Sequence, residues 1–299
     1  MRKVFLILPV FFLHLLFFAI PALYAGTADA DSVRVKIFSF NIQIFGRAKM
    51  ARSGVPAILA DIVLQSDITA IQELRSADIS PVEQFMALLR EKGGEDADPS
   101  LPGKYAYVLG PREGRSSSKE QYWIIYDRTK FTVLAEDTYF DPEDKFERNP
   151  LAVYFQSENL LDFILINNHL KPGDAEAEIE ALPEVVAYYQ NLWGERDVLV
   201  VGDFNADGQY YDESFLHTVF SEDSYRIIIT NEYDTTVAAS DNTYDRFIIT
   251  GEAVEDFTGN FGVMRFDELY DFDQPGITPN AVSDHYPVWA EFYTCRDTD

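Results

Sequence analysis

The sequence predicts an α/β fold of two packed mixed β-sheets flanked by helices, a four-layer α-β-β-α sandwich. Segments with the alternation or the apolar runs of strands recur along the chain and outnumber the segments with helical periodicity. Short polar breaks separate them, and the sequence shows no internal repeat. Many strands with fewer helices are typical of two sheets that pack face to face and carry their helices outside.

The predicted elements follow in chain order. A strand at residues 33–40 precedes a helix that begins after Gly54, and a strand at residues 67–74 follows. Two more helices are expected at residues 81–92 and 174–192, where apolar side chains recur at helical spacing. The remaining strands are expected at residues 105–109, 121–126, 132–140, 151–156, 163–168, 198–202, 225–230, 246–250 and 288–293.

The N-terminus has the organisation of a secretory signal peptide. Arg2 and Lys3 precede an apolar run at residues 4–20, and small residues follow, which fits cleavage after Ala25 or Ala30. No second long apolar segment follows, so a membrane-spanning protein is not expected. We therefore expect a signal peptide at residues 1–25, a secreted protein (extracellular or periplasmic) and no stable membrane association. The remainder, at roughly 270 residues, suits one large domain, residues 31–299, and a monomer.

Cys295 is the only cysteine, so no intramolecular disulfide can form. An exported domain without disulfides must rely on the size of its core or on bound ions.

The charge is strongly negative. The formal net charge of the whole chain is −26. Residues 1–25 contain two cations, Arg2 and Lys3, and no acid, so their removal would bring the charge to −28. Such a surface repels nucleic acid at long range, so a polyanionic substrate needs local cations or metal ions. For most of the acids we expect no role beyond solubility.

Polar residues of related chemistry stand at the ends of several predicted strands. "VLVVGDFNADG" runs four apolar residues into Asp203, and burying that carboxylate is costly unless it is paired or metal-bound. Carboxylates and Asn amides suit Mg²⁺ or Mn²⁺, and imidazoles move protons near neutral pH. Each residue alone also fits an ordinary turn or strand-end role, but together they predict one cleft. The set is Asn41, Glu73, His169, Asp203, Asn205, Asp245, Asp284 and His285.

The motifs that contain these residues resemble those of the endonuclease/exonuclease/phosphatase superfamily, and within it the secreted deoxyribonuclease I group. They are "QELR", "SKEQY", "GDFNADG", "DTTVAASDNTYDR" and "SDHYPV", and the likeness runs from about residue 35 to residue 292. The resemblance implies a catalytic domain over residues 31–299. It also implies that Asn41, Glu73 and Asp284 surround a catalytic divalent cation, Mg²⁺ or Mn²⁺.

The resemblance further implies a histidine pair, His169 and His285, oriented by Glu120 and Asp245 respectively. A carboxylate on the far ring nitrogen fixes the tautomer and favours the charged ring. Which group acts as general base stays open. The resemblance also implies that Asp203 and Asn205 hold the attacking water and a phosphate oxygen. Arg75 and Arg148 are implied to contact phosphate.

Three positions depart from the resemblance. The disulfide of some secreted relatives would need cysteines in place of Gly208 and Asn242. Ser118 replaces a tyrosine that contacts the minor groove. The third departure is Ala238, which replaces one oxygen-bearing position. It lies in a segment for which the resemblance implies a structural Ca²⁺ site at Asp234, Thr236 and Ser240.

The sequence therefore favours a secreted, metal-dependent endonuclease that hydrolyses phosphodiester bonds of DNA with low sequence specificity. A sphingomyelinase-type lipid phosphodiesterase is the alternative, and residues 258–272 are its candidate membrane-binding hairpin. A non-catalytic binding protein with the same fold fits less well, because the expected catalytic residues are intact.

Overall fold

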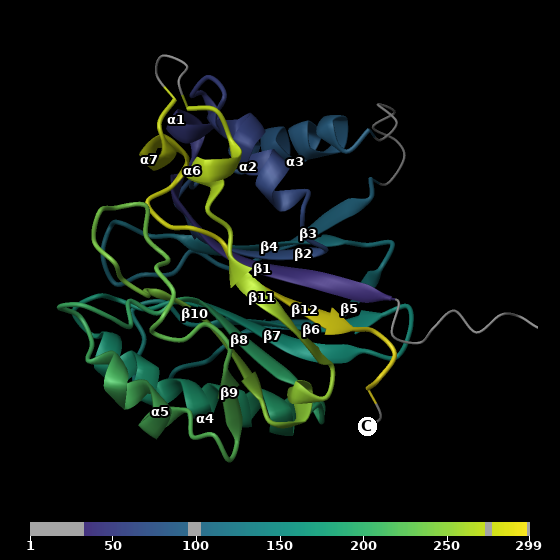
Figure 1. Ribbon diagram of the computed structural model, residues 1–299, viewed down its shortest axis with the longest axis vertical. Coiled ribbons are helices and arrows are strands. Elements are labelled where there is room, and N and C mark those ends of the chain that lie inside the picture. The colour runs from purple at the N-terminus through teal and green to yellow at the C-terminus, as the bar shows by residue number, and fades with distance from the viewer. Residues whose placement is uncertain (1–32, 95–102, 273–276, 298–299) are drawn as a thin grey trace, which may run out of the picture.

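Two six-stranded sheets pack face to face in the computed structural model, which describes residues 33–94, 103–272 and 277–297 (Figure 1). The predicted signal peptide, residues 1–25, lies outside the described residues. None of the helices in the described ranges is long and apolar enough to cross a membrane.

The first sheet has the strand order β11-β12-β1-β2-β4-β3. Only β1 and β2 are parallel, and the other neighbours are antiparallel. Its strands are β1 (Arg34–Phe45), β2 (Ile68–Leu74), β3 (Tyr105–Leu109), β4 (Gln121–Asp127), β11 (Phe257–Val263) and β12 (Val288–Tyr293).

The second sheet has the order β5-β6-β7-β8-β10-β9, with β7 and β8 parallel. Its strands are β5 (Phe131–Thr138), β6 (Leu151–Ser157), β7 (Asp162–His169), β8 (Val198–Asp203), β9 (Tyr225–Ile227) and β10 (Asp245–Thr250). Both sheets are therefore mixed, as predicted.

Helices cover the two outer faces (Figure 1). The first sheet carries α1 (Arg47–Met50), α2 (Val55–Val63), α3 (Ser80–Lys92), α6 (Phe266–Leu269) and α7 (Pro279–Val282). The second carries α4 (Ala175–Trp193) and α5 (Leu216–Val219). Two 3₁₀ turns, η2 (Glu213–Phe215) and η3 (Glu252–Val254), lie in the connections.

Three apolar clusters hold the four layers together. One fills the space between the sheets, and the other two lie between each sheet and its helices. The strand β8 is buried along its whole length because both faces of its sheet are covered. The predicted four-layer sandwich is confirmed.

The element boundaries differ from the predictions at a few points. The strand predicted at residues 33–40 continues to Phe45, and the one predicted at residues 225–230 ends at Ile227. The strand β11 was not predicted, because Gly259, Asn260 and Gly262 break the strand pattern. It pairs with β12, so part of the candidate membrane hairpin, residues 258–263, belongs to the sheet.

Candidate active site

The topology brings the predicted site residues to one end of both sheets. In the first sheet, the parallel pair β1 and β2 supplies Asn41 and Glu73 toward its carboxyl ends. In the second sheet, His169 and Asp203 are register partners at the ends of β7 and β8. Asp245, which begins β10, pairs with Asp203. Strand ends of both sheets therefore meet around a shared centre.

Asn41 connects the two sheets at this centre. Its Nδ2 donates to Asp203 Oδ2 at 2.9 Å and lies 3.4 Å from Glu73 Oε1. Its Oδ1 accepts from the backbone N–H of Gln43 at 3.0 Å, and the second Glu73 oxygen accepts from Ile44 N at 2.8 Å. These bonds hold the Asn41 amide and both Glu73 oxygens in defined positions.

Two imidazoles face the same carboxylate oxygen. The Nε2 atoms of His169 and His285 lie 3.4 Å and 3.5 Å from Asp203 Oδ2. Their Nδ1 atoms lie 2.7 Å from Glu120 Oε1 and 2.8 Å from Asp245 Oδ2. The His169 Nδ1 and Glu120 Oε1 lie close together, but without the alignment of a regular hydrogen bond. A carboxylate can only accept, so each Nδ1 carries a proton and each Nε2 faces the centre.

Burial and charge act in opposite directions on the central groups. Burial raises the pKa of Asp245. It acts likewise on Asp203, but the charges of His285 and His169 outweigh it and lower the pKa of that carboxyl. Burial lowers the pKa of His285, but Asp245 and Asp203 outweigh it and raise this pKa to about 10. Opposed shifts in one cluster are typical of sites that move protons.

Glu120 joins the histidine to two arginines. Arg148 Nε lies 2.6 Å from Glu120 Oε1 and donates to the backbone oxygen of His169 at 2.8 Å. Arg75 Nε lies 3.4 Å from Glu120 Oε2, and its Nη1 donates to Ser118 Oγ at 2.9 Å. Burial raises the pKa of Glu120, but His169, Arg148 and Arg75 outweigh burial and bring the pKa down to about 2. Arg148 is buried, and its Nη2 has no hydrogen-bond partner among the described residues.

Left-handed backbone positions occur at the site. Glu73 has φ +64° and Asn205 has φ +49°, a conformation that costs free energy for residues other than glycine. The Asn205 backbone N–H donates to Asp203 Oδ1 at 3.0 Å, and its amide donates to Leu170 O at 2.9 Å. Gly202 is required here, because a Cβ would lie 1.8 Å from Asn168 O.

Two groups of site residues have oxygen and nitrogen atoms close enough to hold a metal ion. They are Glu73, Glu120 and His169, and Asp203, Asp245 and His285. Asp284 lies at the edge, with Oδ1 at 3.9 Å from His285 Nε2 and a half-exposed side chain. Carboxylates suit hard cations, so the donors of these two groups fit a divalent ion, whereas Asp284 belongs to neither group.

The residues of the predicted calcium loop also converge. Thr236 Oγ1 lies 3.0 Å from Asp234 Oδ1 and 2.8 Å from Ser240 O. Arg265 Nη1 lies 3.3 Å from the other oxygen of Asp234, so a cation of the chain already faces this carboxylate. The loop contacts the centre, because Thr236 pairs with His285 in an isolated bridge.

The loop after Asp203 is held without a disulfide. A Cβ at Gly208 would lie 3.1 Å from Asn242 Oδ1, so the two positions are neighbours, as the resemblance implied. Asp207 Oδ2 accepts from Thr243 N at 2.6 Å and connects the same two segments.

Sequence reasoning missed two residues that hold the site. Tyr122 accepts from the backbone N–H of His169 at 2.8 Å, and Ser283 Oγ donates to Asn41 O at 2.6 Å. Both stand inside quoted motifs: Tyr122 ends "SKEQY", and Ser283 begins "SDHYPV". Their roles depend on contacts distant in sequence, which no local pattern reveals.

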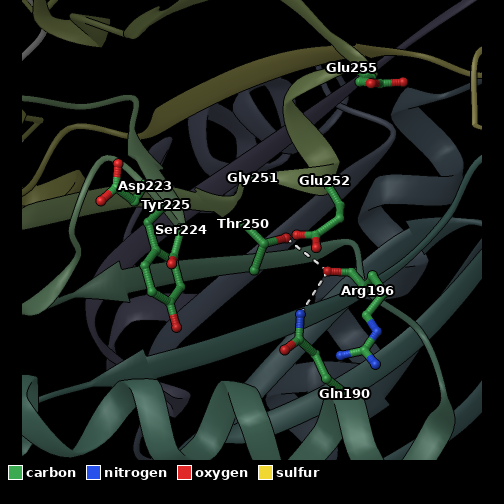
Figure 2. Close-up of a pocket in the computed structure, with 9 residues that line it drawn as sticks. All are labelled: Gln190, Arg196, Asp223, Ser224, Tyr225, Thr250, Gly251, Glu252 and Glu255. Atoms are coloured by element: carbon green, nitrogen blue, oxygen red, sulfur yellow. Dashed lines mark hydrogen bonds between the residues drawn. The ribbon is translucent and has the colours of Figure 1, made fainter.

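A separate cavity of about 620 Å³ lies at the opposite ends of β8 and β10. Figure 2 shows Gln190 and Thr250 bonded to the backbone oxygen of Arg196 beside it. None of the predicted catalytic residues lines this cavity.

Carboxylates and imidazoles gathered at the strand ends of a four-layer sandwich define a hydrolytic α/β enzyme. The chain belongs to the Endonuclease/Exonuclease/phosphatase family, which residues 38–285 match. It is 32% identical to Deoxyribonuclease-1-like 2 of Mus musculus, over 90% of this chain and 95% of that protein. It is 33% identical to Deoxyribonuclease-1 of Gallus gallus, over 85% of this chain and 90% of that protein. Truncated Caenorhabditis elegans TDP2 shares the fold, with a TM-score of 0.59 at 17% identity, over 89% of this chain and 100% of that chain.

Proposed function

We propose that the chain is a secreted endonuclease that hydrolyses phosphodiester bonds of DNA with low sequence specificity and depends on Mg²⁺. The observation that carries this proposal is the pair of imidazoles, His169 and His285, which face one oxygen of Asp203 and are each backed by a carboxylate. Two oriented imidazoles suit a reaction in which one proton is removed from water and another is given to a leaving oxygen. The names of the relatives support DNA as the substrate.

Each residue of the site has its own role in the proposed reaction. The Nε2 atoms of His169 and His285 are the positions that exchange protons with the attacking water and the leaving 3′ oxygen, while Glu120 and Asp245 hold the rings. Arg75 and Arg148, which both face Glu120, are the proposed phosphate contacts. Asp203 and Asn205 position the water and a phosphate oxygen.

Asn41, Glu73 and Asp284 are the residues that would hold Mg²⁺ or Mn²⁺. The ion would supply stabilisation of the charge that develops on the phosphoryl oxygens. Hydrogen bonds hold the Asn41 amide and both oxygens of Glu73 in position.

The lipid phosphodiesterase has less support. Among residues 258–272, Leu269, which is 62% exposed, is the one large apolar side chain that lies mostly in solvent. A membrane-binding hairpin needs exposed aromatic side chains.

Purified mature protein incubated with supercoiled plasmid tests the proposal. We expect nicking with Mg²⁺ and none with EDTA, while Ca²⁺ alone should support little cleavage. Hydrolysis of single-stranded DNA, RNA and sphingomyelin is measured in parallel with plasmid cleavage. Faster turnover of sphingomyelin than of any nucleic acid would overturn the proposal.

A further inference from the structure

Lys49 is a buried lysine next to the candidate active site. It lies on the short helix α1, and only 5% of it is exposed. Its Nζ donates to Ile42 O at 2.7 Å and to Val282 O at 2.9 Å, and it lies 3.5 Å from Gln43 Oε1. Both short bonds end on backbone carbonyl oxygens, so the ammonium binds uncharged groups. Lysine is rarely buried unless it is paired with a charge, so a further reason for its position is needed.

The two carbonyl groups belong to segments that carry two of the proposed metal ligands. Ile42 directly follows Asn41 on β1, and Val282 stands two residues before Asp284. A second contact joins the same segments, because Ser283 Oγ donates to Asn41 O at 2.6 Å. The ammonium and this hydroxyl therefore hold the backbone at Asn41 against the backbone that leads to Asp284.

The first of these segments has a costly backbone conformation. Gln43 and Ile44 have φ +46° and +51°, which is unfavourable for residues other than glycine and most of all for a β-branched one. The pairing of β1 with β2 is irregular at this point. The turn nevertheless directs Gln43 N to Asn41 Oδ1 at 3.0 Å and Ile44 N to Glu73 Oε2 at 2.8 Å. It therefore holds the side chains of two proposed ligands and needs support from its surroundings.

We infer that Lys49 is a positioning residue for the divalent-cation site. It holds the turn at residues 42–45 in its left-handed conformation, and it holds this turn against the segment that precedes Asp284. The inference rests on the proposed function, because it takes Asn41, Glu73 and Asp284 as the ligands. Loss of a group that orients metal ligands typically lowers metal affinity 10–100-fold.

The charge of Lys49 has the opposite effect on a metal ion. Burial lowers the pKa of Lys49 to about 8, while the charges of Asp284 and Glu73 raise it, so both carboxylates are near enough to act on the ammonium. A positive charge at this place repels a second cation. Loss of the ammonium should therefore strengthen metal binding if its charge dominates, and weaken metal binding if its hydrogen bonds dominate.

Manganese binding to full-length mature protein tests the inference without any substrate. Free Mn²⁺ is measured by electron paramagnetic resonance during a titration, and Glu73→Gln identifies the ion that belongs to the site. Lys49→Met removes the ammonium at nearly constant side-chain length. Ile44→Gly is then added to it, because glycine adopts a left-handed conformation without strain. Lys92→Met is the matched control, since Lys92 pairs with Asp61 at 3.0 Å between α3 and α2.

We expect Lys49→Met to raise the Kd of this Mn²⁺ about 10-fold or more, and Lys92→Met to leave it unchanged. Ile44→Gly should recover part of the loss in the Lys49→Met background, since the turn then needs less support. Where circular dichroism shows that Lys49→Met does not fold, Lys49→Gln, which keeps a donor for one carbonyl, replaces it. An unchanged or lower Kd in a folded Lys49 variant would overturn the inference alone. A wild-type protein in which no bound Mn²⁺ depends on Glu73 would overturn the metal assignment of the proposed function, and the inference with it.

Discussion

At the scale of single residues, the proposed chemistry depends on the two imidazoles that face Asp203. Replacing His169 or His285 with Ala should lower plasmid cleavage by about 100-fold or more, because positioned acid–base groups typically contribute that much. The fold should persist, which circular dichroism checks. His217→Ala is the matched control, since His217 is exposed on α5 and belongs to none of the motifs. Near wild-type turnover by either site variant would exclude the assigned acid–base roles.

Glu120 should make stability depend on pH in a defined direction. Its pKa falls to about 2 in the folded protein, below the value in the unfolded chain. Its contribution is therefore fully present above the unfolded pKa, about 4.3, and is lost as the pH falls toward 2. The shift corresponds to stabilisation on the order of 3 kcal/mol at neutral pH.

Urea unfolding of Glu120→Gln and wild type at several pH values measures this contribution. We expect the variant to be less stable at pH 7 by about 1–3 kcal/mol and the gap to narrow steadily below pH 4. A gap of constant size down to pH 3 would show that packing, and not the charge of Glu120, stabilises this part of the site.

At the scale of elements, the ends of the strands position the candidate catalytic residues, and the predicted calcium loop is hydrogen-bonded to the segment that contains His285. The calcium loop pairs with the residues around His285: Val237 N donates to Asp284 O and Tyr286 N to Thr235 O, both at 2.8 Å. Calcium that binds Asp234 and Thr236 should therefore raise both the melting temperature and the activity. Asp234→Ala should abolish the shift in melting temperature.

Arg265 provides a further check on this loop. Its guanidinium already faces Asp234, so calcium has to compete with it. Arg265→Gln should therefore respond to calcium at a lower concentration than the parent does. If Asp234→Ala and its parent respond equally to calcium, the loop is an ordinary turn.

Local patterns were sufficient for the elements whose own residues decide their structure. The apolar run of β8 and the alternation of β12 predicted those strands and placed Asp203 and His285 at their ends. The strand β11 was missed because its glycines carry no strand pattern, and pairing with β12 holds it in the sheet. The contact of Asn41 with Asp203 joins residues 162 positions apart, so only the tertiary structure reveals it.

At the scale of the whole molecule, the net charge of −26 opposes DNA binding, and few cations near the site are free to offset it. Arg148 is buried against Glu120. Lys171 and Arg115 are partly exposed, but both pair with the carboxylate of Asp174. Arg75, with about a third of its side chain exposed, is the most accessible of the predicted phosphate contacts.

Binding should therefore be weak and should depend only slightly on salt. Each neutralised phosphate contributes roughly −0.9 to the slope of log affinity against log salt, so two contacts give about −2. Arg75→Ala should make this slope shallower by about one contact while it spares hydrolysis of a small nitrophenyl phosphodiester. His285→Ala protein, in which cleavage should be about 100-fold or more slower, is titrated with labelled duplex DNA across a salt series to measure this slope. A slope of about −5 or steeper would mean that several more cations of the chain contact the DNA backbone. The acidic surface would then not limit the number of contacts with DNA.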